Sequence, residues 1–95
     1  MATRARVQCI NRTSHTDPHQ RISHIGGKNS DGTRWRMTEA AAINSIKAGE
    51  FAFYVETGGR RVNVIVASRL GREYLKTEAD GVQPDNLLAL QECPL

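Results

Sequence analysis

The sequence predicts an α+β domain in which one helix, about residues 38–49, packs on one face of an antiparallel sheet of four or five strands. Three observations lead to this prediction. A run of strong helix formers has an apolar stripe. Alternating segments flank the pair Gly58-Gly59, as in a β-hairpin. The chain has 95 residues, of which 39% are apolar, so we expect one domain over residues 1–95.

The first strand is expected over residues 4–11, where side chains alternate. Val7 and Cys9 would then face the core, and Ile10 would face outward. A polar loop follows. Residues 22–25 form either a short strand or a turn, and Gly26-Gly27 is read as a tight turn.

The next predicted elements are a short strand over residues 34–37, with Trp35 in the core, and then the helix. Thr38 suits the N-cap of that helix and Glu39 suits the positive end of its dipole. Gly49 is expected to end the helix.

The C-terminal half reads as a hairpin of residues 51–57 and 61–67, then a strand over residues 72–77. Asp80 and Asn86 are expected to act as turn and capping residues. A short helical turn is expected to run through Leu90.

The ends of the chain differ in charge. Residues 1–36 carry seven Lys and Arg against two Asp, whereas residues 73–95 carry one Lys against five acidic residues. A basic N-terminal part is compatible either with pairing to the acidic tail or with a polyanionic partner.

One face of the sheet is predicted to be uncovered, because a single helix covers only the other face. Strand alternation places basic and aromatic side chains on this open face. Cations neutralise phosphates and rings stack on unpaired bases, so the face suits single-stranded nucleic acid or a nucleotide. The residues predicted to bind are Arg34, Arg36, Tyr54, Arg61, Tyr74 and Lys76.

Two other interpretations of this face remain open. It can be a solvated surface that discourages edge aggregation. It can also be a protein-interaction surface, for example a homodimer interface through Ile10, Ile65 and Tyr54. A dimer of this kind would persist in high salt, whereas nucleic-acid binding would weaken steeply with salt.

No pattern predicts catalysis, a cofactor or a metal, so we expect a binding protein that is not an enzyme. His15, Asp17, His19 and His24 are close in sequence but lack the spacing of a strong zinc motif. Polar loops collect histidines for solubility alone.

The two cysteines, Cys9 and Cys93, are expected to be free thiols in a reducing cytoplasm, because no secretion signal accompanies them. A bridge would require α carbons within about 7 Å, which the sequence does not supply. No apolar run reaches the length of a membrane-spanning helix, so no membrane partner is expected.

Several segments together resemble a family of small bacterial proteins of unknown function. They include Ile22-Ser-His-Ile-Gly-Gly27, Tyr74-Leu-Lys-Thr77, Pro84-Asp-Asn-Leu-Leu88 and Glu92-Cys93. The resemblance implies a stand-alone cytoplasmic domain, and makes Lys76, Asp80 and Asn86 candidates for a polar site. It implies no activity, substrate or cofactor.

Overall fold

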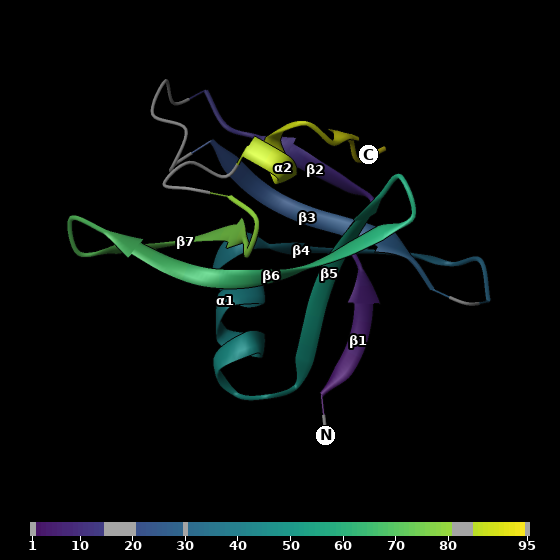
Figure 1. Ribbon diagram of the computed structural model, residues 1–95, viewed down its shortest axis with the longest axis horizontal. Helices are drawn as coiled ribbons and strands as arrows, with labels where there is room; N and C mark the ends of the chain where they lie inside the picture. The colour runs from purple at the N-terminus through teal and green to yellow at the C-terminus, as the bar shows by residue number, and fades with distance from the viewer. Residues whose placement is uncertain (1, 15–20, 30, 81–84, 95) are drawn as a thin grey trace.

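A computed structural model describes residues 2–14, 21–29, 31–80 and 85–94 as two mixed four-stranded sheets and two helices. The first sheet has the order β1-β5-β6-β7 and the second the order β4-β3-β2-β8 (Figure 1). The α+β class is confirmed, but the single antiparallel sheet is wrong, because β1 pairs with β5 and β2 pairs with β8 in parallel. The first sheet consists of β1 (Thr3–Arg6), β5 (Phe51–Thr57), β6 (Arg60–Arg69) and β7 (Arg72–Thr77). The second consists of β4 (Arg34–Thr38), β3 (Ile22–Lys28), β2 (Cys9–Arg12) and β8 (Gln91–Glu92).

The N-terminal segment changes sheets halfway along. The Val7 amide donates to the Tyr54 carbonyl of β5 at 2.8 Å, and the Gln8 amide donates to the Gly26 carbonyl of β3 at 2.9 Å. The stretch predicted as one strand is therefore two strands in two sheets. Ile10 consequently faces the space between the sheets and is fully buried, so its predicted outward orientation is wrong.

The pair Gly26-Gly27 lies inside strand β3, and its prediction as a tight turn is wrong. A β carbon on Gly27 would stand 2.3 Å from the Arg6 carbonyl oxygen. Glycine at this position allows the N-terminal segment to cross directly over β3.

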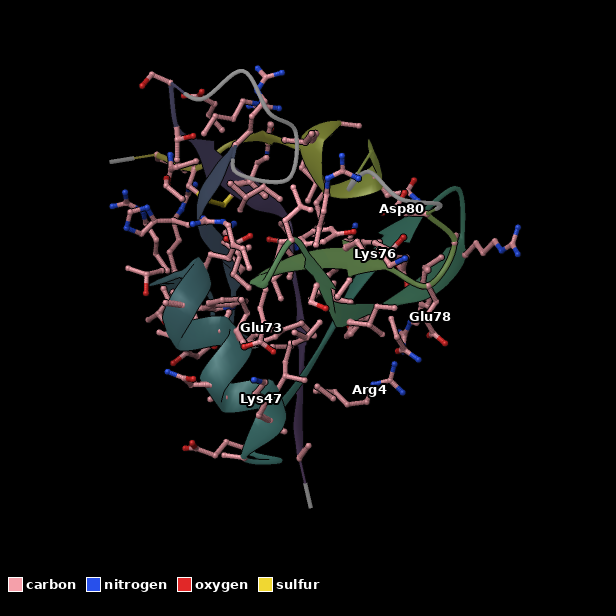
Figure 2. All side chains as sticks on the ribbon, turned by 90° about the vertical axis from the view of Figure 1, so that its left-hand side faces the viewer. Arg4, Lys47, Glu73, Lys76, Glu78 and Asp80 are labelled. Atoms are coloured by element: carbon pink, nitrogen blue, oxygen red, sulfur yellow. A yellow bond between two sulfur atoms is a disulfide. The ribbon has the colours of Figure 1, made fainter. Side chains whose placement is uncertain are left out.

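The main helix, α1 (Glu39–Lys47), lies close to its predicted position. The Thr38 hydroxyl accepts a hydrogen bond from the Ala41 amide at 3.1 Å, which confirms Thr38 as the N-cap. Gly49 follows the helix with a φ of 73°, as the end of a helix requires. Lys47 in the last turn forms an ion pair with Glu73 of β7, and the two side chains point toward one another in Figure 2.

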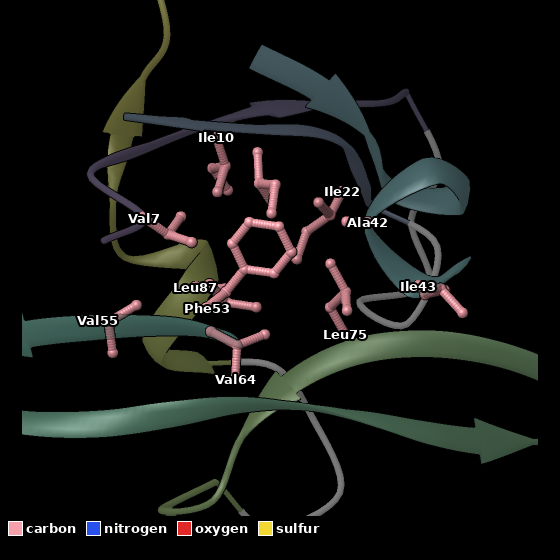
Figure 3. Close-up of a cluster of buried hydrophobic side chains, with 11 residues drawn as sticks. Val7, Ile10, Ile22, Ala42, Ile43, Phe53, Val55, Val64, Leu75 and Leu87 are labelled. Carbon is pink, nitrogen blue, oxygen red and sulfur yellow. The ribbon is translucent and has the colours of Figure 1, made fainter. Parts of the chain in front are cut away.

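The core fills the space between the two sheets (Figure 3). Phe53 of β5 is at its centre, between residues from both sheets and both helices. Burying these side chains is the main stabilising contribution to such a fold. The buried members are Val7, Ile10, Ile22, Ile25, Ala42, Ile43, Phe53, Val55, Val64, Leu75 and Leu87.

The two predicted hairpin strands and the strand 72–77 are confirmed as β5, β6 and β7. The short second helix, α2 (Asp85–Leu88), is anchored through Asp80. One carboxylate oxygen of Asp80 accepts from the amide and hydroxyl of Thr77, and the other accepts from the amide and side chain of Asn86. Asp80 is thus a turn and capping residue, as predicted, whereas Asn86 lies within α2 and donates to Asp80 and Thr77.

Cys9 and Cys93 form a disulfide, with α carbons 4.8 Å apart and a separation of 84 positions in sequence. The expectation of free thiols is wrong. Parallel pairing of β8 with β2 brings the C-terminal cysteine beside the N-terminal one. No helix in the described ranges is long and apolar enough to cross a membrane.

Candidate anion-binding site

A pocket of about 450 Å³ opens where the β1–β2 crossover, the ends of β3 and β4 and the C-terminal segment meet. Figure 1 shows these segments converging toward the right-hand side of the molecule. We call this cavity the basic pocket, because the charged residues in its described lining are four cations and one carboxylate. These are Arg6, Lys28, Arg34, Arg36 and Glu56.

A second cavity of about 420 Å³, the side pocket, adjoins it. The two cavities share Arg6, Lys28 and Trp35, and the side pocket adds Arg4 and Tyr54. Trp35 is half-buried, and its ring stacks on Phe53 with centroids 5.5 Å apart. Packing against the core fixes the indole in place, while its position between the pockets leaves part of it accessible.

Among the cations of the described lining, Arg6 is the one with a buried donor atom that lacks an acceptor. Its Nε atom is buried and has no hydrogen-bond partner in the part of the chain that the structure describes. Its other contacts are long, with Nη2 to the Glu56 carbonyl at 3.4 Å and Nη1 to the Glu56 carboxylate at 3.8 Å. A buried donor left in this state costs free energy that an added acceptor would recover.

The remaining cations of the basic pocket are held to different degrees. Arg36 donates from Nε to the Asn11 side-chain oxygen at 2.7 Å. Lys28 and Arg34 form no ion pair with any described residue. Neither cation is paired with a carboxylate in the part of the chain that the structure describes, so the described lining carries a net positive charge.

The charge of Arg36 also acts on His24 of β3. Burial and, second, the charge of Arg36 hold the pKa of His24 below its ordinary value. The other residues considered for zinc, His15, Asp17 and His19, lie outside the described residues. Within those residues, no group of three or more His, Cys, Asp or Glu side chains is placed to hold a metal.

Tyr54 lies between two guanidinium groups on the outer face of the first sheet. The Cζ atoms of Arg4 and Arg61 are each 5.0 Å from the centre of its ring. Arg61 also donates from Nε to Glu56 at 2.8 Å, and this hydrogen bond is the main cause that lowers the pKa of Glu56. Glu56 thus stays ionised and links the Tyr54 cluster to Arg6.

The predicted binding residues are divided between three places. Arg34 and Arg36 line the basic pocket, whereas Tyr54 and Arg61 lie on the adjoining outer face. Lys76 lies on β7, opposite Ile65 of β6, and lines neither pocket.

Tyr74 is only 3% exposed, so its predicted place on the open face is wrong. Its neighbour Leu75 is fully buried, so both faces of β7 are covered at this point. Strand alternation assigns one residue to the core and the next to solvent, and it fails where a strand is covered on both faces.

Sequence reasoning missed Arg6 and Lys28 as site residues. The alternation that turns Val7 toward the core also turns Arg6 to the outer face, and the crossover then brings Arg6 beside β3 and β4. Lys28 directly follows the pair predicted to form a tight turn, whereas it is the last residue of β3 and pairs with Arg34.

The fold and the site define a small two-sheet α+β protein with a basic, aromatic-lined cavity at one end. The chain belongs to the family described as proteins of unknown function (DUF3892), which it matches over residues 6–91. Comparison with curated proteins and with solved structures gives no match.

Proposed function

We propose that this protein binds an anionic partner, single-stranded nucleic acid or a nucleotide, in the basic pocket and the adjoining side pocket. The observation that supports this most strongly is the buried Nε of Arg6, which has no acceptor among the described residues. A phosphate oxygen at this position would supply that acceptor, and charge-assisted bonds of this kind are the strong ones.

The aromatic side chains favour a nucleotide over a simple anion. Trp35 lines both cavities and Tyr54 lines the second. Rings of this kind stack on unpaired bases, and arginine adds cation–π attraction. Bases paired in a duplex are already stacked on their neighbours, so we propose a single-stranded ligand.

We propose binding without catalysis. In the described lining of the basic pocket, Glu56 is the one carboxylate, and its contacts are to Arg6 and Arg61. Because the arginines keep Glu56 ionised, it is a poor general acid. It can still orient the cations around it.

Part of the interface expected for the alternative homodimer is buried in the core. Ile10 is fully buried, so it cannot contribute to an interface through the outer face. Ile65 is half-buried, and the one large apolar side chain found exposed in the described part of the chain is Leu70, on the turn between β6 and β7. No observation favours pairing through the first sheet.

Titration of labelled single-stranded DNA and RNA by fluorescence anisotropy at several salt concentrations tests the proposal. We expect binding that weakens with salt. The double variant Lys28→Gln, Arg34→Gln should make the slope of log affinity against log salt shallower by about 1.4, the value for two lost phosphate contacts on a single strand. Arg69→Gln, at the far hairpin, is the matched control. No binding at low salt would reject the proposal.

Trp35 provides a second measurement, because it is the single tryptophan of the chain. Stacking of a base on its indole should quench the intrinsic fluorescence, whereas inorganic phosphate should not. Quenching by mononucleotides that disappears in Tyr54→Leu would assign Tyr54 to the same site.

A further inference from the structure

The Cys9–Cys93 disulfide lies in the wall of the basic pocket, since both cysteines line it. We infer that this disulfide exchanges with a small anionic thiol that enters the basic pocket. Cys9 and Cys93 are only 8% and 6% exposed and both line the pocket, so the proposed route of a reagent to their sulfur atoms runs through it. The inference holds whether or not the pocket also binds nucleotides.

Cations surround the approach to the sulfur atoms. Arg6, Lys28, Arg34 and Arg36 line the same cavity as the disulfide. Arg36 is joined to Cys93 by two hydrogen bonds: its Nε donates to the Asn11 oxygen at 2.7 Å, and the Asn11 amide donates to the Cys93 carbonyl at 3.3 Å. The arginine is therefore tied to the C-terminal segment that carries the disulfide.

The positive charge promotes the exchange in two ways. It raises the local concentration of an anionic thiol at the pocket. It also stabilises the thiolate that leaves when the disulfide opens, and a more stable leaving thiolate departs faster.

The reaction is balanced with a thiol as the reductant. The thiolate of the incoming molecule attacks one cysteine sulfur, the Sγ–Sγ bond breaks, and the other cysteine leaves as a thiolate. A second molecule of the thiol attacks the mixed disulfide, which releases the oxidised small-molecule disulfide and leaves two reduced cysteines. Two electrons pass from two thiols to the protein.

The structure keeps the two cysteines together after the bond opens. The Cys93 amide donates to the Ile10 carbonyl at 3.0 Å, next to Cys9. Arg12 donates to the carbonyls of Leu88 and Leu90. These hydrogen bonds hold the segment before β8 against β2. The thiols thus stay adjacent and can form the disulfide again, as a reversible redox centre requires.

Reduction of the oxidised full-length chain by three thiols tests the inference: 2-mercaptoethanesulfonate (anionic), 2-mercaptoethanol (neutral) and cysteamine (cationic). Rates are measured by alkylation and intact mass spectrometry, and are compared at equal thiolate concentration. The same series on the urea-unfolded chain gives the intrinsic reactivities.

We expect the anionic thiol to be favoured over the cationic thiol at least about 10-fold more in the folded chain than in urea, within the range of electrostatic steering. The preference should fall toward the urea value in about 1 M salt, where screening is nearly complete. Lys28→Gln, Arg34→Gln should reduce it and Arg69→Gln should not.

Two results would overturn the inference. One is a charge preference equal to that of the unfolded chain, and the other is a folded chain that none of the three thiols reduces. Either result would make the disulfide a purely structural bridge. The salt dependence uses the unmodified chain, so the test does not rely on the variants folding.

Discussion

Gly26 lies so close to Cys93 that a β carbon on residue 26 would stand 2.9 Å from the Cys93 sulfur. The same atom would be 2.8 Å from the Trp35 carbonyl oxygen and 3.1 Å from the Cys9 sulfur. The disulfide therefore packs directly on the backbone of β3, and the glycine is required by space rather than by a turn.

We expect Gly26→Ala and Gly27→Ala to destabilise the fold by about 1–3 kcal/mol, the usual cost of overpacking. Gly27→Ala should cost more, because its β carbon would stand 2.3 Å from the Arg6 carbonyl oxygen, against 2.8 Å from the Trp35 carbonyl oxygen for Gly26→Ala. Urea denaturation measures both.

Gly32→Asn is the control for the glycine substitutions, since nothing lies within 4 Å of a β carbon at Gly32 and asparagine tolerates its positive φ. Its unfolding free energy should change by less than about 1 kcal/mol. Full stability of Gly27→Ala would show that the crossover is not so tightly packed.

Local signals predicted the helix and the central hairpin well, because each depends on residues close in sequence. Thr38 and Gly49 bound the helix, and Gly58-Gly59 turns the chain between β5 and β6. The arrangement of the sheets depends on distant contacts. Nothing local to Val7 and Gln8 shows that the chain leaves one sheet for another between them.

The same limit applies to the site. Arg34 and Arg36 could be chosen from composition and alternation alone, and they line the basic pocket. Arg6 becomes part of the pocket only because the crossover places it beside Gly27, 21 residues later in the chain. The disulfide depends on a pairing between β2 and β8 that only two residues of β8 make, too short a strand to be recognised by alternation.

Asp80→Ala should destabilise the fold by about 2–4 kcal/mol. The carboxylate accepts four hydrogen bonds, and its loss leaves the amide of the fully buried Thr77 without that acceptor. Thermal or urea unfolding measures the effect. Asp31→Ala is a matched control, because Asp31 accepts from the amide and hydroxyl of Thr33 in an exposed turn. Equal losses for the two variants would contradict the role of Asp80 as the anchor that joins Thr77 to α2.

Glu39 is expected to make the stability depend on pH. The side chain is 7% exposed and accepts a hydrogen bond from the Leu75 amide on the edge of β7. Burial raises the pKa of Glu39 above its ordinary value of 4.5, while the Leu75 amide and Arg72 oppose this shift in part. The folded state therefore holds the proton more tightly than the unfolded state, and the unfolding free energy falls as the pH rises through the window above 4.5.

Glu39→Gln should remove this dependence, because a glutamine oxygen still accepts from Leu75 and does not ionise. Relative to the unmodified chain, the variant should gain stability as the pH rises above 4.5. Urea denaturation at several pH values measures the difference. Glu78→Gln, at an exposed position, controls for the loss of one negative charge. A difference between Glu39→Gln and the unmodified chain that does not change with pH would exclude the proposed effect.

Leu70 occupies a position that suits another residue. It is 95% exposed and has a φ of 53°, and with Gly71 at 79° it forms the two-residue turn between β6 and β7. Positive φ at both positions is typical of a type I′ turn, where asparagine followed by glycine is favoured. Leu70→Asn should therefore stabilise the fold by about 0.5–1 kcal/mol, since asparagine adopts this conformation at lower cost. Leu70→Ala removes the same apolar surface without relieving the backbone, so it should give no gain. If both variants were equally stabilised in urea denaturation, the exposed apolar surface rather than the backbone conformation would be the source of the cost.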